Sequence, residues 1–173
     1  MDNNTQCPIK GCLGKWLGGA VVTFILLFAC GFVIHHVWLM PIYQATAPLW
    51  RPMEQMQTMF PLMLAYYALL ALAISALFCK VKKGKMACIA AAGEQSECKI
   101  GGKHCPIRYG LCFGIVIGVL MGTLCAGSYI WMPIPGDLAV KWFIGDVVQG
   151  IVIGVTLALL CHCCKKKDCT SAG

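Results

Sequence analysis

The chain has few charged residues, and acidic residues are especially scarce. Only 12% of its 173 residues are Asp, Glu, Lys or Arg, whereas 59% are hydrophobic. A soluble domain typically has about 25% charged and about 45–50% apolar residues. The shortage of charge therefore excludes an ordinary soluble domain and indicates a protein that lies mainly within a membrane.

The sequence also lacks any pattern of catalytic residues. It contains no glycine-rich motif for a phosphate or a nucleotide, and no Ser, His and Asp order typical of a hydrolase. Only seven residues are acidic, and most of them lie outside the apolar runs. We therefore expect that the protein is not an enzyme.

What the sequence does contain is four apolar runs, each long enough to cross a bilayer. They cover residues 16–40, 61–79, 109–131 and 142–161. A helix of about 20 residues spans the roughly 30 Å of hydrocarbon in a bilayer. Little chain remains outside the runs, so we predict an all-α integral membrane protein built as a four-transmembrane-helix bundle.

Positive charge is scarce at one end of this predicted bundle. Of the 14 Lys and Arg residues, only Arg51 and Lys141 lie between the first and second runs or between the third and fourth. Cytoplasmic loops are enriched in Lys and Arg, so both termini and the middle loop are predicted to be cytoplasmic. The net charge of +7 favours anionic lipids of the inner leaflet. Nucleic acid is not an expected partner, because no soluble fold presents these cations.

The predicted outer loops have no cysteine, although the chain has 13. Cysteines instead gather near the predicted cytoplasmic ends of the runs. The cytoplasm keeps thiols reduced, so these residues are expected to stay free, to bind metal or to be modified. A disulfide scaffold is not expected.

The two halves of the chain share a pattern that indicates an internal duplication. The pattern M-P-I-x7-W-x3-[E/D]-x2-Q begins at Met40 and again at Met132. A C-P-I-[K/R] stretch precedes each half, at residues 7–10 and 105–108. Each half holds two apolar runs, so both halves enter the membrane from the same side. We therefore predict two parallel helical-hairpin repeats with the same orientation.

The predicted repeats cover residues 16–80 and 109–164, and each consists of two helices joined by a short outer loop. The four helices are expected at about 16–40, 50–80, 109–131 and 138–164. The outer loops then cover residues 41–49 and 132–137. The remaining segments are a cytoplasmic N-terminal segment, a basic loop with cysteines and a basic tail, at residues 1–15, 81–108 and 165–173.

Each repeat carries an acid and an amide one helical turn apart, and two histidines end the first helix at a similar depth. Residues three apart share a helix face, and polar groups in lipid normally face the bundle interior. We predict a polar intramembrane site near the outer leaflet for a proton or a cation. In the alternative interpretation, these groups only hydrogen-bond between helices and fix the packing. The residues are Glu54, Gln57, Asp146, Gln149, His35 and His36.

Sulfur ligands form two groups that suggest a soft metal such as copper, or zinc. The first is an M-x2-M-x2-M-x3-M series at the start of the second helix, and the second is a Cys-His-Cys-Cys stretch after the fourth run. The M-x3-M within "MFPLM" is similar to that of trimeric copper transporters, a resemblance that implies copper handling. Methionine also fills packed cores, and cysteines beside lysines are typical of palmitoylation sites. The candidate ligands are Met53, Met56, Met59, Met63, Cys161, His162, Cys163 and Cys164.

Glycines recur every fourth residue in the third and fourth runs. Gly114, Gly118 and Gly122 form G-x3-G-x3-G, and Gly150 and Gly154 form G-x3-G. This spacing permits close approach between helix backbones in a membrane. We predict that the third and fourth helices pack tightly, or that one glycine face forms a homo-oligomer.

Three functions are compatible with these patterns, and all three place the protein in a lipid bilayer. The first is a small transporter or channel-like protein that uses the outer polar site. The second is a non-catalytic protein of membrane assembly or interaction. The third is a protein that handles copper or zinc. The sequence does not identify the substrate, a cofactor, the oligomeric state or the membrane.

Overall fold

A computed structural model describes residues 9–83, 99–100, 103–104 and 106–170, and most of these are helical. The long helices are α1 (Ile9–Phe32), α4 (Phe60–Lys83), α5 (Pro106–Ala126) and α6 (Gly136–Thr170). Short helical segments follow them or connect them, namely the π-helical η1 (Val33–Trp38), α2 (Met40–Ala45), the 3-10 helix η2 (Ala47–Leu49), α3 (Met53–Thr58) and the 3-10 helix η3 (Gly127–Ile130). Two antiparallel two-residue strands, β1 (Lys99–Ile100) and β2 (Lys103–His104), precede α5.

Within the described residues, four helical segments are long and apolar enough to cross a membrane. They are Trp16–Trp38, Phe60–Val81, Ile107–Ile130 and Gly136–Cys161. The prediction of an all-helical integral membrane protein with four spans is therefore confirmed. Each span overlaps one of the four helices predicted from the sequence.

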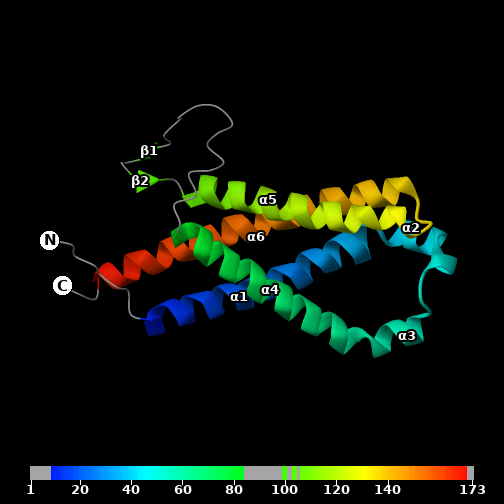
Figure 1. Ribbon diagram of the computed structural model, residues 1–173, viewed down its shortest axis with the longest axis horizontal. Coiled ribbons are helices and arrows are strands. Elements are labelled where there is room, and N and C mark those ends of the chain that lie inside the picture. Colours follow the sequence, from blue (N-terminus) through cyan, green and yellow to red (C-terminus); the bar gives the residue numbers. More distant parts are fainter. Residues whose placement is uncertain (1–8, 84–98, 101–102, 105, 171–173) are drawn as a thin grey trace.

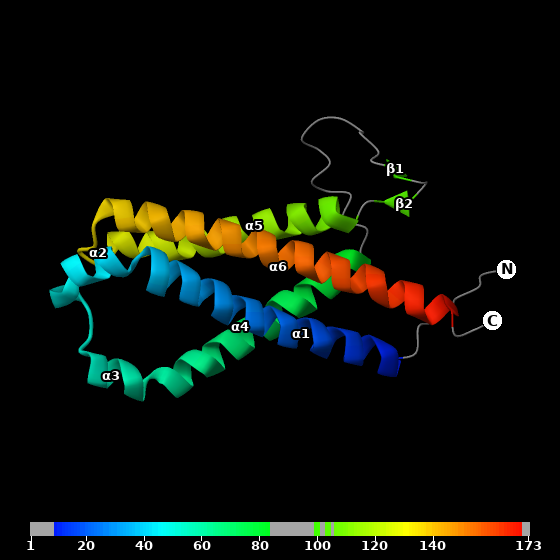
Figure 2. The same ribbon diagram turned by 180° about the vertical axis from the view of Figure 1, so that it is seen from behind.

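The helices form an elongated bundle in which α5 and α6 lie side by side along their length (Figures 1 and 2). Helix α1 packs against both α4 and α6, and it crosses α4 near the middle of the bundle. Helices α1 and α5 begin at one end of the bundle, where α4 and α6 finish. The opposite end carries α2 and α3, and we call it the connector end.

The contact between α5 and α6 is made by backbone against backbone. A Cβ atom added at Gly114 would lie 2.5 Å from the carbonyl oxygen of Gly150, and one added at Gly118 would lie 2.7 Å from the Cα of Val147. Gly122 approaches Phe143 in the same way. The glycines predicted to permit close packing thus lie at this contact, and Gly154 faces Gly110, which the sequence pattern did not include.

Two apolar clusters fill the remaining interior. The larger cluster joins all four long helices, with Leu27, Phe78, Phe113, Ile153 and Leu157 among its buried members. The smaller cluster lies at the connector end and is made by Leu39, Ile134, Leu138 and Ala139. The smaller cluster packs the segment that follows α1 against the start of α6 and the end of α5 at the connector end.

Polar contacts connect α1 to α4 closer to the other end. The Ser75 hydroxyl donates a hydrogen bond to the carbonyl oxygen of Trp16 at 2.9 Å, and the Trp16 indole N–H donates to the carbonyl oxygen of Leu72 at 3.4 Å. Thr23 is fully buried and donates to the carbonyl oxygen of Gly19 at 2.8 Å. Trp16, Thr23 and Ser75 therefore satisfy their polar groups at helix carbonyls, as hydrocarbon requires.

The second span is not the continuous helix predicted from about residue 50. The backbone is extended at Trp50 and Pro52, α3 covers only Met53–Thr58, and α4 begins at Phe60. Pro61 has no N–H to donate, and its ring would clash with the carbonyl group four residues earlier in a continuous helix. This proline therefore separates α3 from α4.

The backbone contact predicts a selective effect of adding one methyl group. We expect Gly114→Ala to destabilise the folded protein by about 1–3 kcal/mol, because the nearest atoms belong to a rigid helix backbone. We expect Gly18→Ala to be neutral or stabilising, because a Cβ at Gly18 meets nothing within 4 Å. Unfolding of the purified variants in SDS, followed by circular dichroism, measures both effects. Equal stability of the two variants would show that the α5–α6 contact is not close.

Candidate functional site

Asp146 is an acid within the fourth span, on α6, about 15 Å along the helix axis from its start at Gly136. Its carboxylate oxygen Oδ2 is buried and has no hydrogen-bond partner among the described residues. An unpaired ionisable group inside a membrane costs on the order of several kcal/mol. Such a group is uncommon in a purely structural role, because nearly all buried polar atoms in proteins are hydrogen-bonded.

Side chains from four other elements interact with this carboxyl group. The thiol of Cys125 on α5 hydrogen-bonds to it. His35 on η1, Tyr43 on α2 and Tyr67 on α4 lie close enough to interact with it electrostatically. We call these five residues the Asp146 cluster. The cluster thus combines residues of η1, α2, α4, α5 and α6.

A chain of hydrogen bonds holds one side of the cluster. The indole Nε1–H of Trp142 donates to the hydroxyl oxygen of Tyr43 at 2.7 Å, and the same hydroxyl lies 2.7 Å from Nδ1 of His35. A phenol has a single proton to donate. When that proton points to Nδ1, both of these hydrogen bonds are formed, and neutral His35 carries its own proton on Nε2.

The π-helical turn explains why only one of the two predicted histidines joins the cluster. Its wider winding is shown by the bond from the Leu39 N–H to the carbonyl oxygen of Ile34, five residues earlier. Single π-helical turns are rare and are frequent at functional sites. His35 stacks on Tyr43, whereas His36 stacks on Phe32 with ring centroids 5.0 Å apart, and both histidines are exposed.

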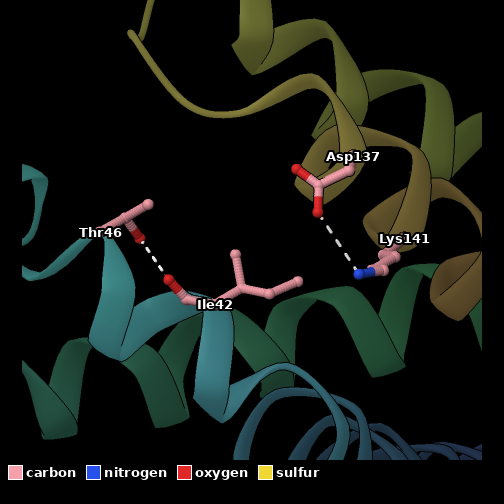
Figure 3. Close-up of polar contacts among 4 residues, drawn as sticks. All are labelled: Ile42, Thr46, Asp137 and Lys141. Atoms are coloured by element: carbon pink, nitrogen blue, oxygen red, sulfur yellow. Dashed lines mark hydrogen bonds and ion pairs between the residues drawn. The ribbon is translucent and has the colours of Figure 1, made fainter.

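Aromatic residues of the connector end support Tyr43 from the other side. Trp50 makes an edge contact with the Tyr43 ring at 5.2 Å and lies 6.2 Å from Trp142, measured between ring centroids. The Trp50 indole N–H donates to Thr46 Oγ1 at 2.9 Å, and Thr46 in turn donates to the carbonyl oxygen of Ile42 at 2.7 Å (Figure 3). This packing partly buries Tyr43, and the burial raises the pKa of its phenol.

The nearest cation on α6 is engaged by a different acid. Lys141 Nζ lies 3.4 Å from Asp137 Oδ2, four residues earlier on the same helix (Figure 3). Both side chains are exposed, and an exposed pair of this kind stabilises a protein by less than about 1 kcal/mol. Electrostatically, the histidine of the cluster therefore acts on Asp146, and Lys141 acts on Asp137.

The other residues of the predicted polar site lie elsewhere. Gln149 is buried, with 5% of its surface exposed, one turn further along α6 from Asp146. Glu54 and Gln57 are exposed on α3, which Figures 1 and 2 show on the opposite side of the bundle from α5 and α6. The structure therefore places His35 within electrostatic range of Asp146, but it does not bring the two acid–amide pairs to each other.

The structure describes the side chains of only five of the eight predicted metal ligands. Within the described part of the chain, no group of three His, Cys, Asp or Glu residues is placed to hold a metal ion. Met53, Met56 and Met59 are exposed, and Met63 is half-buried on α4. Cys161 is half-buried at the end of the fourth span. The side chains of His162, Cys163 and Cys164 lie outside the described residues.

The sequence patterns did not identify three members of the cluster. Cys125 is a cysteine in mid-membrane, remote from the cytoplasmic thiols, and this position was its only signal. Tyr43 follows the repeated M-P-I, and Tyr67 lies in an apolar run. Nothing in their spacing connects them to Asp146, because the link depends on how the helices cross.

Comparisons of the chain with protein-family models, with curated proteins and with solved structures found no match. The function must therefore be inferred from the cluster itself. Its carboxyl, thiol, imidazole and phenol groups can each bind or release a proton, and they meet within the membrane-spanning part of the chain. This arrangement is suited to taking up a small cation from the connector end.

The burial of Tyr43 predicts that its phenol ionises above the ordinary pKa of 10.0. A near-ultraviolet titration of the folded protein and of Tyr43→Phe isolates this phenol by difference. Because the pKa is raised in the folded state, the contribution of this phenol to stability is present below about pH 10 and is lost as the pH rises through the folded-state pKa. The same difference in unfolded protein provides the control. Identical midpoints for folded and unfolded protein would contradict burial of Tyr43.

Proposed function

We propose that the protein is a small multi-pass membrane transporter or channel-like protein that takes up a proton or small cation at Asp146. The observation that supports this function is the buried, unpartnered Oδ2 atom of Asp146 in a span. A structural acid would gain from a second hydrogen-bond donor, because leaving a buried acceptor unsatisfied costs about 1–3 kcal/mol. An acid held with one oxygen available is able to bind a cation and release it.

We further infer that the Asp146 cluster faces the outer leaflet and that both termini are cytoplasmic. Arg51 and Lys141 are the basic residues of the connector end, whereas the middle loop and the tail carry many more. The excess of Lys and Arg at the other end supports this orientation. A cation would then reach the cluster from outside, through the surface formed by α2 and η1.

The proposed duplication has support from one contact. Trp50 and Trp142 occupy the same place in the repeated pattern, and their rings lie against each other. Both hairpins also begin at the same end of the bundle (Figure 1). We infer two parallel hairpins, of which only the second has kept its acid inside the bundle.

A non-catalytic assembly role is the alternative, in which Asp146 and its neighbours only fix helix packing. The glycine faces of α5 and α6 are occupied by each other, so they do not favour a homo-oligomer through these faces. Soft-metal handling has no supporting observation within the described residues. Transport and assembly are the two remaining functions. A substitution of Asp146 that keeps the shape of the side chain but removes its charge distinguishes between them.

We expect Asp146→Asn to abolish cation uptake by proteoliposomes that contain the purified protein, because the amide cannot carry the negative charge. The matched control is Asp137→Asn on the same helix, whose carboxylate is exposed and pairs with Lys141. Proton uptake is followed with an internal pH-sensitive dye, and monovalent-cation uptake with radioactive rubidium. Asp137→Asn is expected to retain the wild-type rate.

Two results would contradict this proposal. Unchanged uptake in Asp146→Asn would show that the cluster is a packing element. A wild-type protein that moves neither protons nor rubidium would favour the assembly role. Circular dichroism and size-exclusion chromatography of both variants show whether a loss of uptake comes from a loss of fold.

A further inference from the structure

Trp142 lies between Asp146 and the start of α6, which is at the connector end of the bundle. The two residues are four positions apart on this helix, so their side chains share one face, about 6 Å apart along the axis. Trp142 is the one nearer Gly136, where α6 begins. A cation that moves along this face from the connector end therefore meets the indole ring before it meets the acid.

Two neighbouring elements pack directly on α6 at the depth of Asp146. A Cβ atom added at Gly118 of α5 would lie 2.8 Å from the carbonyl oxygen of Asp146. One added at Gly145 would lie 2.9 Å from Cγ2 of Ile34 on η1. The first contact is with backbone, and the second is with a stiff β-branched side chain. Access to the acid from α5 or from η1 therefore changes only if the helices separate.

The Trp142 ring is held by two aromatic residues of the first hairpin. Its Nε1–H donates to the hydroxyl oxygen of Tyr43, a residue 99 positions away in the sequence, at 2.7 Å. The Trp50 ring lies 6.2 Å from the Trp142 ring at an inclination of 60°, and it makes an edge contact with Tyr43 at 5.2 Å. We call Tyr43, Trp50 and Trp142 the aromatic cover. The cover joins the outer connector of the first hairpin to the beginning of α6.

The aromatic cover stands on a rigid base. Leu39 and Leu138 are fully buried, and all three rings of the cover pack against the cluster that contains these leucines. The rings themselves are only half-buried. Loss of one hydrogen bond changes an equilibrium by about twofold to tenfold. Loss of the bond between Trp142 and Tyr43 is therefore expected to change the position of the rings while the base keeps the helices in place.

The repeated sequence pattern accounts for the two tryptophans of the cover. A Trp stands four residues before the acid in each copy of the pattern. In the first copy the backbone at Trp50 is extended and Glu54 lies on the separate helix α3, so Trp50 does not share a helix face with its own acid. Its ring packs on Trp142 instead. Both tryptophans are thus on the connector side of the one acid of the pattern that lies on α6.

We propose that the aromatic cover is the gate of the Asp146 site, in which Trp142 blocks the path from the connector end and Tyr43 is the positioning residue that holds Trp142 closed. This inference rests on the proposed function, because it names the residues that control access to the same acid. The gate opens when the hydrogen bond between Trp142 and Tyr43 breaks and the indole ring turns away from the face that it shares with Asp146.

Chemical labelling of Asp146 from water tests the gate. A water-soluble carbodiimide with glycine ethyl ester converts an accessible carboxyl group to an amide, and mass spectrometry of peptides gives the rate at each residue. In full-length protein in lipid nanodiscs, we expect Asp146 to react about twofold to tenfold faster in Tyr43→Phe and in Trp142→Phe than in the wild type, because each variant loses the hydrogen bond. Asp137 is exposed on the same helix, and its rate is the internal reference that stays constant.

Controls separate the gate from a general loosening of the bundle. Tyr129→Phe and Trp131→Phe are the matched variants, because both rings are exposed at the connector end, and they are expected to keep the wild-type rate. Dicyclohexylcarbodiimide enters from the lipid, so it is expected to label Asp146 equally in all variants. A double variant, Tyr43→Phe with Trp142→Phe, is expected to match the single variants, because both substitutions remove the same bond.

The gate and the proposed function fail in different ways. Equal labelling of Asp146 in the wild type, Tyr43→Phe and Trp142→Phe would overturn the gate, even where uptake depends on Asp146. So would labelling of wild-type Asp146 as fast as Asp137. A double variant whose effect is the product of the single effects would overturn the role of the hydrogen bond. The expected labelling pattern, together with wild-type uptake in Asp146→Asn, would support the gate and overturn the proposed function.

Discussion

The backbone contact between α5 and α6 is the constraint on which the candidate site depends. Gly118 lies against the backbone of Asp146 and Val147, and Gly122 lies against Phe143. No residue with a side chain fits these positions without moving one helix away from the other. Because the helices touch here, the Cys125 thiol is held within hydrogen-bonding distance of the Asp146 carboxyl group. The glycines therefore act on the site indirectly, by fixing the distance between a donor and its acceptor.

The first hairpin contributes to the site in a different way. Helix α1 packs on both α4 and α6, and its π-helical end turns His35 toward Tyr43 while Leu39 enters the apolar cluster of the connector end. Two pairs of helices thus make up the candidate site. Helices α5 and α6 are closely packed against each other, and α1 and α4 form a more open pair that covers the site. The close-packed side holds Asp146 and Cys125, and the open side holds His35, Tyr43 and Tyr67.

Composition and periodicity were sufficient to predict the four spans and the glycine contact, because both depend on local properties of the chain. The cluster was predicted only in part. Asp146 and His35 are uncommon residues in apolar runs, so each is conspicuous alone. Cys125, Tyr43 and Tyr67 are ordinary residues of such runs, and their importance comes from helix crossings that no spacing encodes. Gln149 is buried, whereas Glu54 and Gln57 are exposed.

A pair of prolines explains why the first copy of the pattern has an exposed amide and the second copy a buried one. In the first copy Pro52 precedes the acid and Pro61 follows it, and these residues confine α3 to a short helix between two breaks. In the second copy Ile144 stands where the first has Pro52, and no proline follows Gln149, so α6 continues through the acid without interruption. The tryptophans that begin each copy still meet at the connector end. Beyond them only α6 carries its acid along the bundle to Cys125, and this continuity is what makes Asp146, rather than Glu54, the acid of the site.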